Sequence, residues 1–377
     1  MALEVELKLT LSPHHIESLK LQPLFRSKEI KELGTQVLKN TYYDTPDQQL
    51  SANKVALRIR EKGDQLIQTL KSRGTSEAGM HSRHEWEWII PDHQLDFAHL
   101  ETAQWPKSLH CSDLQNSIIP VFSTDFTRTT WILDTVDHAG EPLKVEIALD
   151  QGEVTYQAGD QLRSDPLCEL ELELMEGNPT SMVKFAIKLA RHVPLYISDI
   201  SKAQRGYRLH NPENYSVTRT AFTPEKDDSL ETVFTCLIRD ELSLWPSYLE
   251  AWQFNGDWRY ITLALESLRN TSALYETFSD IIPADPDGCI DKLLTRFIRQ
   301  LRDLDAWRRT ADLCGSADSD WLIAQEEKAA KRMTVLLQTI EPGVLALLIS
   351  EQLIQQSWQK RWTDTHKENA GNTLLKG

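Results

Sequence analysis

Residues 3–9 of the chain are LEVELKL, a stretch in which charged and aliphatic side chains alternate strictly. In a β-strand successive side chains point to opposite faces, so Glu4, Glu6 and Lys8 would share one face and the leucines and valine the other. A single segment of this kind is typical of an edge strand with a solvated outer face. Its meaning therefore depends on whether the pattern recurs.

The alternation recurs in four further segments: ALRIREK (56–62), RHEWEWII (83–90), KVEIALD (144–150) and CELELEL (168–174). Like charges two residues apart on a strand lie about 7 Å apart and repel, so ordinary solvated faces carry more Thr, Ser and Gln. Five such segments predict a closed antiparallel barrel that is apolar outside, where helices cover it, and charged inside.

Composition limits the class of protein. The chain has 377 residues, enough for two domains, and a formal charge of −15, which argues against nucleic acid or an anionic membrane as the main partner. Five cysteines without a CxxC spacing predict reduced thiols and a cytoplasmic protein. No apolar run reaches the roughly 18–20 residues of a membrane span. Because the first predicted strand begins near residue 3, we expect no signal peptide before it.

The sequence predicts two domains. Residues 1–211 are rich in strand patterns, expected near 3–9, 40–45, 55–62, 65–71, 83–90, 122–134, 143–150, 153–157 and 168–175. Ser12 before Pro13, and Asn178 before Pro179, are expected to begin helices. Residues 212–228 are polar and predicted to form a linker. Residues 229–377 carry apolar stripes of helical period, which predict a helical bundle.

The predicted interior holds three pairs of carboxylates two residues apart, Glu4 with Glu6, Glu85 with Glu87, and Glu169 with Glu171. Buried like charges raise each other's pKa unless a cation neutralises them. Hard divalent cations such as Mg²⁺ and Mn²⁺ bind carboxylate oxygens and water. The pairs therefore indicate a divalent metal site.

Basic residues fall on or beside the same strands. Guanidinium forks and lysine ammonium groups both bind phosphate. A tube lined by such bases and by metal-binding acids suits an extended polyanion during phosphoryl transfer, although a structural salt-bridge network in a filled barrel also fits the pattern. The predicted phosphate-binding residues are Lys8, Arg58, Arg60, Lys71, Arg83, Arg128 and Lys202.

EVELK at 4–8 resembles the ExExK signature of the CYTH domain, also called the triphosphate tunnel metalloenzymes. Seven more segments follow in the family's order over residues 2–209: NTYYDTPDQQL, ALRIR, QTLKSRG followed by GMHSRHEWE, FTRTTWIL, VEIALDQG, CELELELMEG and SKAQRGYRL. The resemblance implies an α+β protein whose eight-stranded antiparallel tunnel, flanked by helices, hydrolyses or cyclises triphosphates with Mg²⁺ or Mn²⁺.

The resemblance also implies roles for individual residues. Glu4, Glu6, Glu169 and Glu171 resemble the metal ligands. The substrate contacts are matched by Lys8, Arg58, Arg60, Lys71, Arg128 and Lys202. The expected catalytic set is Lys8 with the interior acids Glu85, Glu87, Glu146 and Asp150, one or more of which would place a second metal or the attacking water. Asp44, in YYDT, is expected to be structural.

The all-α region resembles a short, divergent CHAD domain, chiefly in RQLRDLDAWRR at 299–309. It departs from that family in having no histidine between His210 and His366 and in carrying 18 Lys and Arg against 26 Asp and Glu over residues 213–377. A polyphosphate-binding domain should be basic. We therefore expect a structural role for this domain, or a homodimer formed through it, rather than polyphosphate binding.

Together with the charged interior, these resemblances imply a metal-dependent enzyme that hydrolyses inorganic triphosphate to phosphate and pyrophosphate. The alternatives within the fold are a thiamine or nucleoside triphosphatase and an adenylate cyclase. A non-catalytic protein that binds polyphosphate is the alternative from another class.

Overall fold

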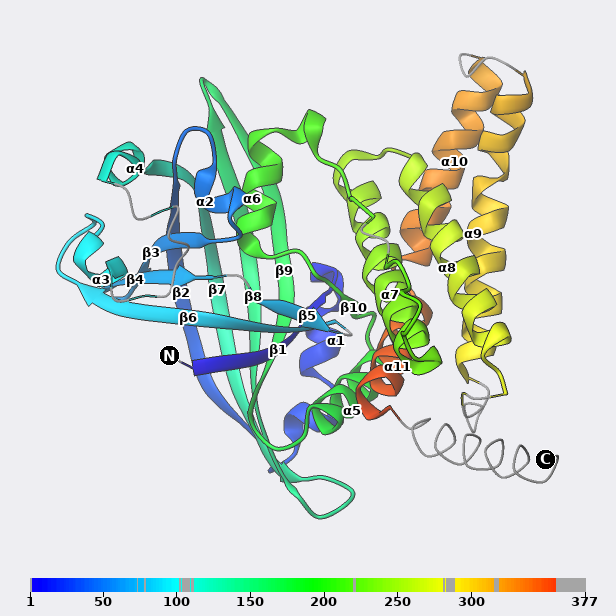
Figure 1. Ribbon diagram of the computed structural model, residues 1–377, viewed down its shortest axis with the longest axis horizontal. Coiled ribbons are helices and arrows are strands. Elements are labelled where there is room, and N and C mark those ends of the chain that lie inside the picture. The colour runs from blue at the N-terminus through cyan, green and yellow to red at the C-terminus, as the bar shows by residue number, and fades with distance from the viewer. Residues whose placement is uncertain are drawn as a thin grey trace. The chain divides into compact units, whose positions relative to one another are not determined.

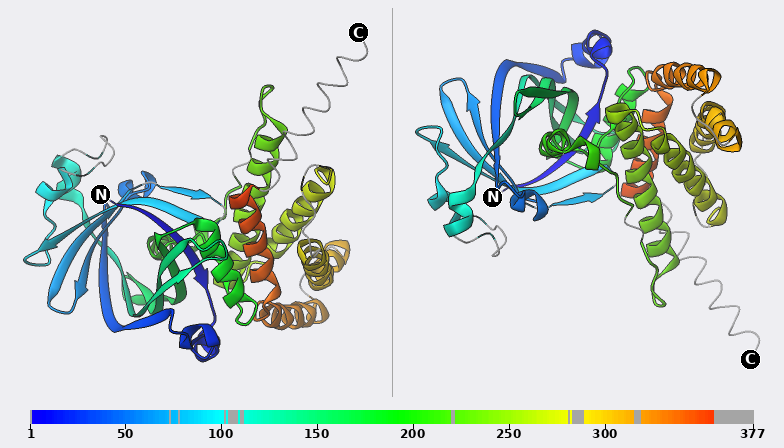
Figure 2. Two further views of the ribbon diagram at one scale, coloured as in Figure 1. Left: turned by 90° about the horizontal axis from the view of Figure 1, so that it is seen from below. Right: turned by 90° about the horizontal axis from the view of Figure 1, so that it is seen from above.

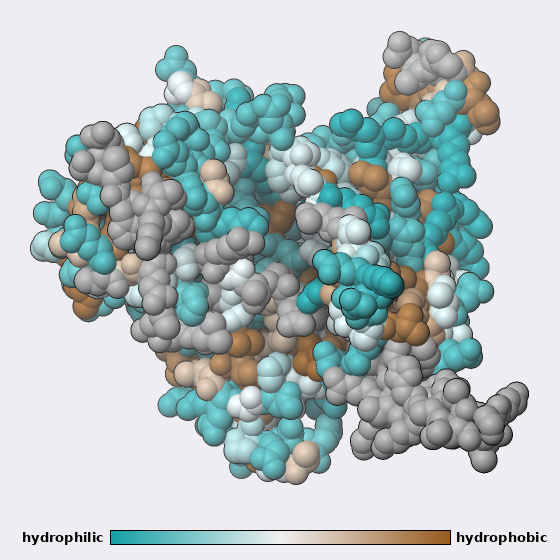
Figure 3. Space-filling view, viewed as in Figure 1, coloured by the Kyte–Doolittle hydropathy of each residue, from teal (hydrophilic) through white to brown (hydrophobic). Residues whose placement is uncertain are grey.

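The computed structural model describes residues 2–356 except for 73, 78, 102, 104–108, 110–111, 220–221, 281, 283–288 and 315–318. Side chains are described for the same residues other than 2–4, 75–77, 83 and 112–113. The chain divides into two compact units: Met1–Met182 with Ser198–Tyr215, and Val183–Ile197 with Ser216–Gly377 (Figure 1). Most of the described residues on the face shown in Figure 3 are hydrophilic.

The first unit is an antiparallel sheet that closes on itself. Around the ring the order is β1–β9–β8–β7–β2–β3–β4–β6, and β6 pairs again with β1, so eight strands form a barrel (Figure 2). The short β5 pairs with β6 outside the ring. The eight-stranded barrel predicted above is confirmed. The strands are β1 (Ala2–Thr10), β2 (Ile30–Asp44), β3 (Ala56–Lys62), β4 (Gln65–Lys71), β5 (Thr75–Glu77), β6 (Met80–Ile90), β7 (Ile119–Val136), β8 (Pro142–Ala158) and β9 (Gln161–Glu176).

The apolar face of the strands points outward, as the alternation predicts. Leu57 of β3 and Leu70 of β4 are fully buried in a cluster that also contains Leu50 and Leu100, and Trp86 of β6 packs against it. Leu50 belongs to α2 (Gln49–Ala52) and Leu100 to α3 (Phe97–Glu101), with α4 (Ser112–Ser117) completing the cover. Burying this face against helices leaves the alternate, charged side chains for the interior.

Two strands differ from the expected ones. β2 begins at Ile30 rather than near residue 40, because its weakly patterned first half pairs with β7. The segments expected at 143–150 and 153–157 are one strand, β8, that runs through Gly152. A Cβ at Gly152 would lie 2.1 Å from the carbonyl oxygen of Asp125 on β7, so the absence of a side chain lets the two strands stay paired there.

The short helical segments of this unit are η1 (Pro13–His15), α1 (Ile16–Lys20), η2 (Pro23–Arg26), α6 (Lys202–His210) and η4 (Pro212–Asn214). The expected cap at Ser12 is wrong, since its side chain makes no capping hydrogen bond and Pro13 opens a 3-10 turn instead. The expected cap at Asn178 is confirmed, because its Oδ1 accepts from the backbone N–H of Thr180 at 2.8 Å where α5 (Pro179–Ala190) begins.

The second unit is helical, as expected. Its helices are α7 (Leu230–Asn255), α8 (Arg259–Thr277), α9 (Cys289–Cys314), α10 (Asp320–Leu336) and α11 (Glu341–Gln355). Residues 183–197, with the end of α5 and β10 (Tyr196–Ile197), belong to it too. A Cβ at Gly343 of α11 would lie 1.8 Å from the Leu195 carbonyl oxygen, so this glycine permits the close packing. The likeness of this unit to a CHAD domain stays a prediction.

Within the described residues, no single helix has the length and apolarity to span a membrane, and only α10 and α11 taken together, across a 55° bend, pass that test by length and composition.

Candidate active site

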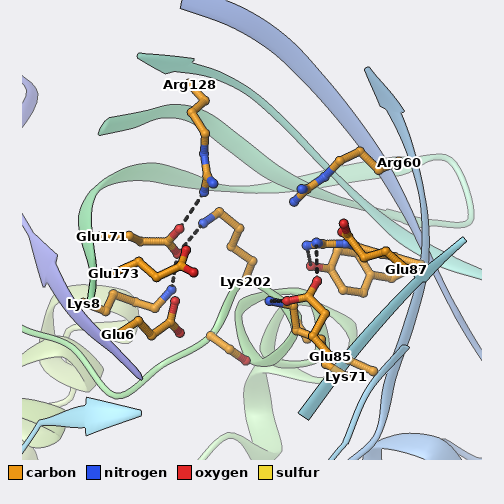
Figure 4. A pocket seen from close by; sticks show the side chains of 15 residues that line it. Glu6, Lys8, Arg60, Lys71, Glu85, Glu87, Arg128, Glu171, Glu173 and Lys202 are labelled. Atoms are coloured by element: carbon orange, nitrogen blue, oxygen red, sulfur yellow. Dashed lines mark hydrogen bonds and ion pairs between the residues drawn. The ribbon is translucent and has the colours of Figure 1, made fainter. Parts of the chain in front are cut away.

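The interior of the barrel contains a charged cavity of about 230 Å³ (Figure 4). Seven strands and the beginning of α6 contribute its lining. The alternation of the strands aims five basic and five acidic side chains into it, and α6 adds Lys202. The lining residues are Glu6, Lys8, Tyr42, Ala56, Arg58, Arg60, Lys71, Glu85, Glu87, Arg128, Glu171, Glu173, Ser201, Lys202 and Ala203.

Three carboxylates converge at one side of the barrel. Asp150 of β8 and Glu169 of β9 are register partners, and Glu171 follows two residues later on the same face of β9. One oxygen from each of the three lies within 4.8 Å of the others. Asp150 and Glu169 are fully buried, so their charges must be compensated within the protein.

Lys8 of β1 provides the first compensating charge. Its ammonium group lies 3.3 Å from Glu169 Oε1 and 2.5 Å from Glu171 Oε1. Lys202, at the first position of α6, lies 2.7 Å from Asp150 Oδ2 and 2.9 Å from Glu171 Oε1, and it also pairs with Glu169.

Arg128 of β7 completes the set. It donates from Nε to Asp150 Oδ1 and from Nη2 to Asp150 Oδ2, both at 2.7 Å, and from Nη2 to Glu171 Oε2 at 2.5 Å. Burial alone would raise the pKa values of Asp150 and Glu171, but Lys202 and Arg128 outweigh it and lower both pKa values. The carboxylates expected to raise each other's pKa are therefore neutralised by the protein's own bases.

A second group of charges surrounds Glu85 of β6. Its Oε1 lies 3.4 Å from Arg58 Nη2 and its Oε2 lies 2.5 Å from Lys71 Nζ. Arg58 also donates to the Tyr42 hydroxyl at 3.4 Å. Burial would raise the pKa of Tyr42, but Arg58 and Lys202 outweigh burial and lower it. Tyr42 is thus part of the cationic side of the cavity.

Arg60 differs from the other bases in the cavity. Its Nε donates to Asn40 Oδ1 at 2.8 Å, and no described carboxylate lies within ion-pair distance of its guanidinium group. Burial, and then the charges of Arg58 and Arg128, lower the pKa of Arg60 to about 10. A half-buried cation in this situation is stabilised by any anion that enters the cavity.

The other interior acids have different surroundings. Glu87 of β6 lines the cavity and accepts a hydrogen bond from Thr69 Oγ1 at 3.3 Å. Burial, followed by the charges of Glu146 and Glu6, raises the pKa of Glu173. Glu146 itself does not line the cavity, although it is the register partner of Glu173.

Most of the residues selected from the sequence come together here. The cavity brings together Glu6, Lys8, Arg58, Arg60, Lys71, Glu85, Glu87, Arg128, Glu171 and Lys202, while Asp150 and Glu169 lie directly behind it. Glu4 and Arg83 are paired through the backbones of β1 and β6, but their side chains lie outside the described residues.

Sequence reasoning missed Tyr42, Asn40 and Glu173. Tyr42 and Asn40 lie on the interior face of β2, where uncharged residues leave no alternation of charge to detect. Glu173 does follow the alternation of β9 and could have been selected with its neighbours.

Asp44 is structural, as expected. It is fully buried, and its two oxygens accept from the backbone N–H groups of Thr45, Leu50 and Ser51 at 2.7–3.0 Å and from the hydroxyl of Tyr207 at 2.6 Å. These bonds fix the turn from β2 into α2 and join it to α6.

The CYTH-domain model matches residues 2–207, more than half of the chain. The chain belongs to the CYTH family. An inorganic triphosphatase from Haemophilus influenzae is 36% identical over 210 residues, which are 55% of this chain and 55% of that protein. The chain thus matches about half the length of this relative.

The solved structures similar to this chain are more distant in sequence. A putative adenylyl cyclase from Hippeastrum, described as having a dominant triphosphatase activity, is 21% identical over 55% of this chain and 96% of its own, with a TM-score of 0.37. A protein from Pyrococcus horikoshii is 19% identical over 56% of this chain and 99% of its own, with a TM-score of 0.32.

Proposed function

We propose that this CYTH protein hydrolyses inorganic triphosphate to phosphate and pyrophosphate inside the barrel, with Mg²⁺ or Mn²⁺ as cofactor. The observation that carries the proposal is Arg60, a half-buried cation that faces the cavity with no described carboxylate partner. Membership of the CYTH family and the likeness to the Haemophilus triphosphatase support the same reaction.

Bases on opposite sides of the cavity would hold the substrate. Figure 4 shows Arg60 pointing inward from one side, with Arg128 and Lys202 on the other. Guanidinium forks bind phosphate bidentately, and two facing sets would keep a short chain of phosphates extended between them. This positioning places the terminal phosphorus for in-line attack.

The lining favours inorganic triphosphate over a substrate with a ring. Tyr42 is the one aromatic side chain among the described lining residues. It is 4% exposed, and its ring stacks on Phe122 with centroids 4.8 Å apart. A nucleobase or thiamine ring would therefore find no open aromatic face to stack on.

The three converging carboxylates fit a divalent cation. Asp150, Glu169 and Glu171 offer only oxygen donors, which Mg²⁺ and Mn²⁺ prefer. Glu169 Oε2 is buried and accepts no hydrogen bond from any described residue, so one ligand oxygen remains available. A cation bound there would neutralise phosphoryl oxygens and acidify a bound water. Glu6, which lines the cavity, remains a proposed ligand beside them.

The chain's own groups would carry the rest of the reaction. Water attacks the terminal phosphorus, a new P–O bond forms, and the bridging P–O bond breaks with its electron pair leaving on pyrophosphate. Of the proposed interior acids, Asp150 is paired with Arg128, and Glu85 with Arg58 and Lys71. Glu87 lines the cavity with no ion pair to a described base, so we assign it the proton of the attacking water.

One comparison of substrates tests the proposal. Phosphate release is measured from triphosphate, thiamine triphosphate and ATP, each with Mg²⁺, with Mn²⁺ and after chelation. The highest kcat/KM is expected for triphosphate, with activity lost on chelation. A higher kcat/KM for ATP or thiamine triphosphate would make the substrate wrong. No release from any of the three, with triphosphate still bound, would favour a binding protein instead.

A further inference from the structure

Helix α6 delivers Lys202 to the carboxylates from its first turn. Ser201 precedes it as the N-cap: its Oγ accepts from the N–H of Gln204, and its own N–H donates to Gln204 Oε1 at 2.8 Å. This reciprocal capping fixes where the helix begins. It does not fix how the helix is turned about its axis, which decides where the Lys202 ammonium group lies.

Contacts one turn further along set that rotation. A Cβ added to Gly206 would lie 2.2 Å from two ring carbons of Phe122 on β7, so the helix backbone lies directly against this ring. The ring of Tyr207 meets Phe122 edge-on, with centroids 5.1 Å apart and planes at 79°. Phe122 also stacks on Tyr42, whose hydroxyl accepts from Arg58. This aromatic group therefore connects the middle of α6, at Gly206 and Tyr207, with Tyr42 on the cationic side of the cavity.

The hydroxyl of Tyr207 is fixed as well. It donates to Asp44 Oδ2 at 2.6 Å, and Asp44 is itself held by three backbone N–H groups at the turn after β2. Burial and the Asp44 charge raise the pKa of Tyr207, so the hydroxyl keeps the proton that it donates. The helix is thus attached to a rigid point of the barrel wall.

We propose that Tyr207 is a positioning residue, whose hydrogen bond to Asp44 sets the rotation of α6 and thereby aims Lys202 into the cavity. The proposal rests on the proposed function, since it concerns how Lys202 meets triphosphate. Lys202 and Tyr207 are five residues apart, about 7.5 Å along the helix axis. A rotation at Tyr207 therefore moves Lys202 directly, and misplacement by about 1 Å costs up to roughly 10²-fold in rate.

The test is a double-mutant cycle of Tyr207→Phe with Lys202→Gln. Tyr207→Phe removes one oxygen and keeps the ring contact with Phe122, while Asp44 retains its three backbone donors. We expect Tyr207→Phe alone to lower kcat/KM for triphosphate about tenfold, and to change it less than about twofold when Lys202 is already Gln. Tyr43→Phe is the matched control, because Tyr43 lies next to Tyr42 but on the outer face of β2. It should leave kcat/KM unchanged both alone and together with Lys202→Gln.

The cycle separates positioning from general stability. Equal losses in both backgrounds, or no loss in either, would overturn the positioning role, and thermal unfolding of each variant shows whether the fold is retained. The same cycle is also measured by calorimetry as triphosphate affinity. If the unchanged protein binds triphosphate without hydrolysing it, the proposed function fails and the affinity cycle decides the role of Tyr207. A protein that neither binds nor hydrolyses triphosphate overturns both.

Discussion

Arg128 holds Asp150 through two parallel hydrogen bonds of 2.7 Å, and the same guanidinium group reaches Glu171 at 2.5 Å. Asp150 is fully buried, so the pair is a fixed part of the barrel wall. It joins the carboxylates proposed for the metal to a base proposed for the substrate. A change at Asp150 should therefore disturb both binding functions at once.

Replacing Asp150 with Asn tests this coupling. The amide cannot accept both hydrogen bonds of Arg128, and the half-buried Arg128 and the buried Lys202 lose a counter-charge. We expect a loss of about 10²-fold in kcat and a destabilisation of about 3–5 kcal/mol, the cost of breaking a buried ion pair. Urea unfolding and phosphate release measure the two effects. Asp134→Asn, an exposed change on β7, should have neither effect.

Metal affinity provides a prediction that does not depend on turnover. Glu169→Gln removes the carboxylate whose Oε2 is buried without a described hydrogen-bond partner. We expect the affinity for Mn²⁺, measured by electron paramagnetic resonance, to fall at least about tenfold. Glu153→Gln, exposed on β8, is the control. Unchanged Mn²⁺ affinity in the Glu169 variant would show that the cation binds elsewhere.

Arg60 should show opposite effects on stability and on function. Burial and neighbouring cations lower its pKa to about 10, so the charged side chain is unfavourable in the empty cavity. Arg60→Met should raise the melting temperature by a few degrees and raise KM for triphosphate at least about tenfold. Lys62 is exposed at the end of the same strand, and Lys62→Ala should change neither the melting temperature nor KM for triphosphate. If Arg60→Met lowered the melting temperature by several degrees, the charge of Arg60 would not be unfavourable in the folded protein.

Leu57 tests the outward face of the same strand. It is fully buried in the cluster that includes Leu50 of α2 and Leu100 of α3. Leu57→Ala should cost about 2–5 kcal/mol in the free energy of unfolding, while kcat of the folded fraction stays within about twofold. If folded Leu57→Ala protein were inactive, the assignment of the two faces would be wrong.

The barrel was predictable because its strands alternate charged and aliphatic residues. In β1, β3, β6 and β9 that alternation specifies the register, since a slip by one residue would turn the charges outward. The same signal is absent from the first half of β2, and for this reason the strand was placed too short at the sequence level. The continuation of β8 through Gly152 depends on a contact with β7 that no local pattern contains.

The site was predictable as a set of residue types but not as a set of pairs. Alternation placed Glu169, Glu171 and Lys8 in the interior. That Lys8, Lys202 and Arg128 neutralise those carboxylates depends on distances between strands far apart in sequence. Tyr42 was missed for a similar reason, because its role comes from Arg58 and Phe122 rather than from its neighbours in the chain.

The helical unit gives the last prediction, which concerns long-chain polyphosphate. Residues 213–377 carry 18 Lys and Arg against 26 Asp and Glu. Several of the described arginines lie beside acids: Arg259 pairs with Asp257, Arg296 with Glu341 and Arg302 with Asp303. A polyanion is bound through several convergent bases that release counter-ions, and bases already paired with carboxylates contribute little to such binding.

Polyphosphate should therefore bind through the barrel alone. We expect triphosphate to compete with it in the full-length protein, and Arg60→Met to leave only contacts weaker than about 10⁻⁴ M at physiological salt. Gel shift and calorimetry with long-chain polyphosphate measure both. Arg259→Ala changes an exposed arginine of the helical unit and leaves the barrel as it is. This variant should bind long-chain polyphosphate as tightly as the wild-type protein does. Micromolar affinity that persists in Arg60→Met and falls in Arg259→Ala would instead place a polyphosphate site on the helices.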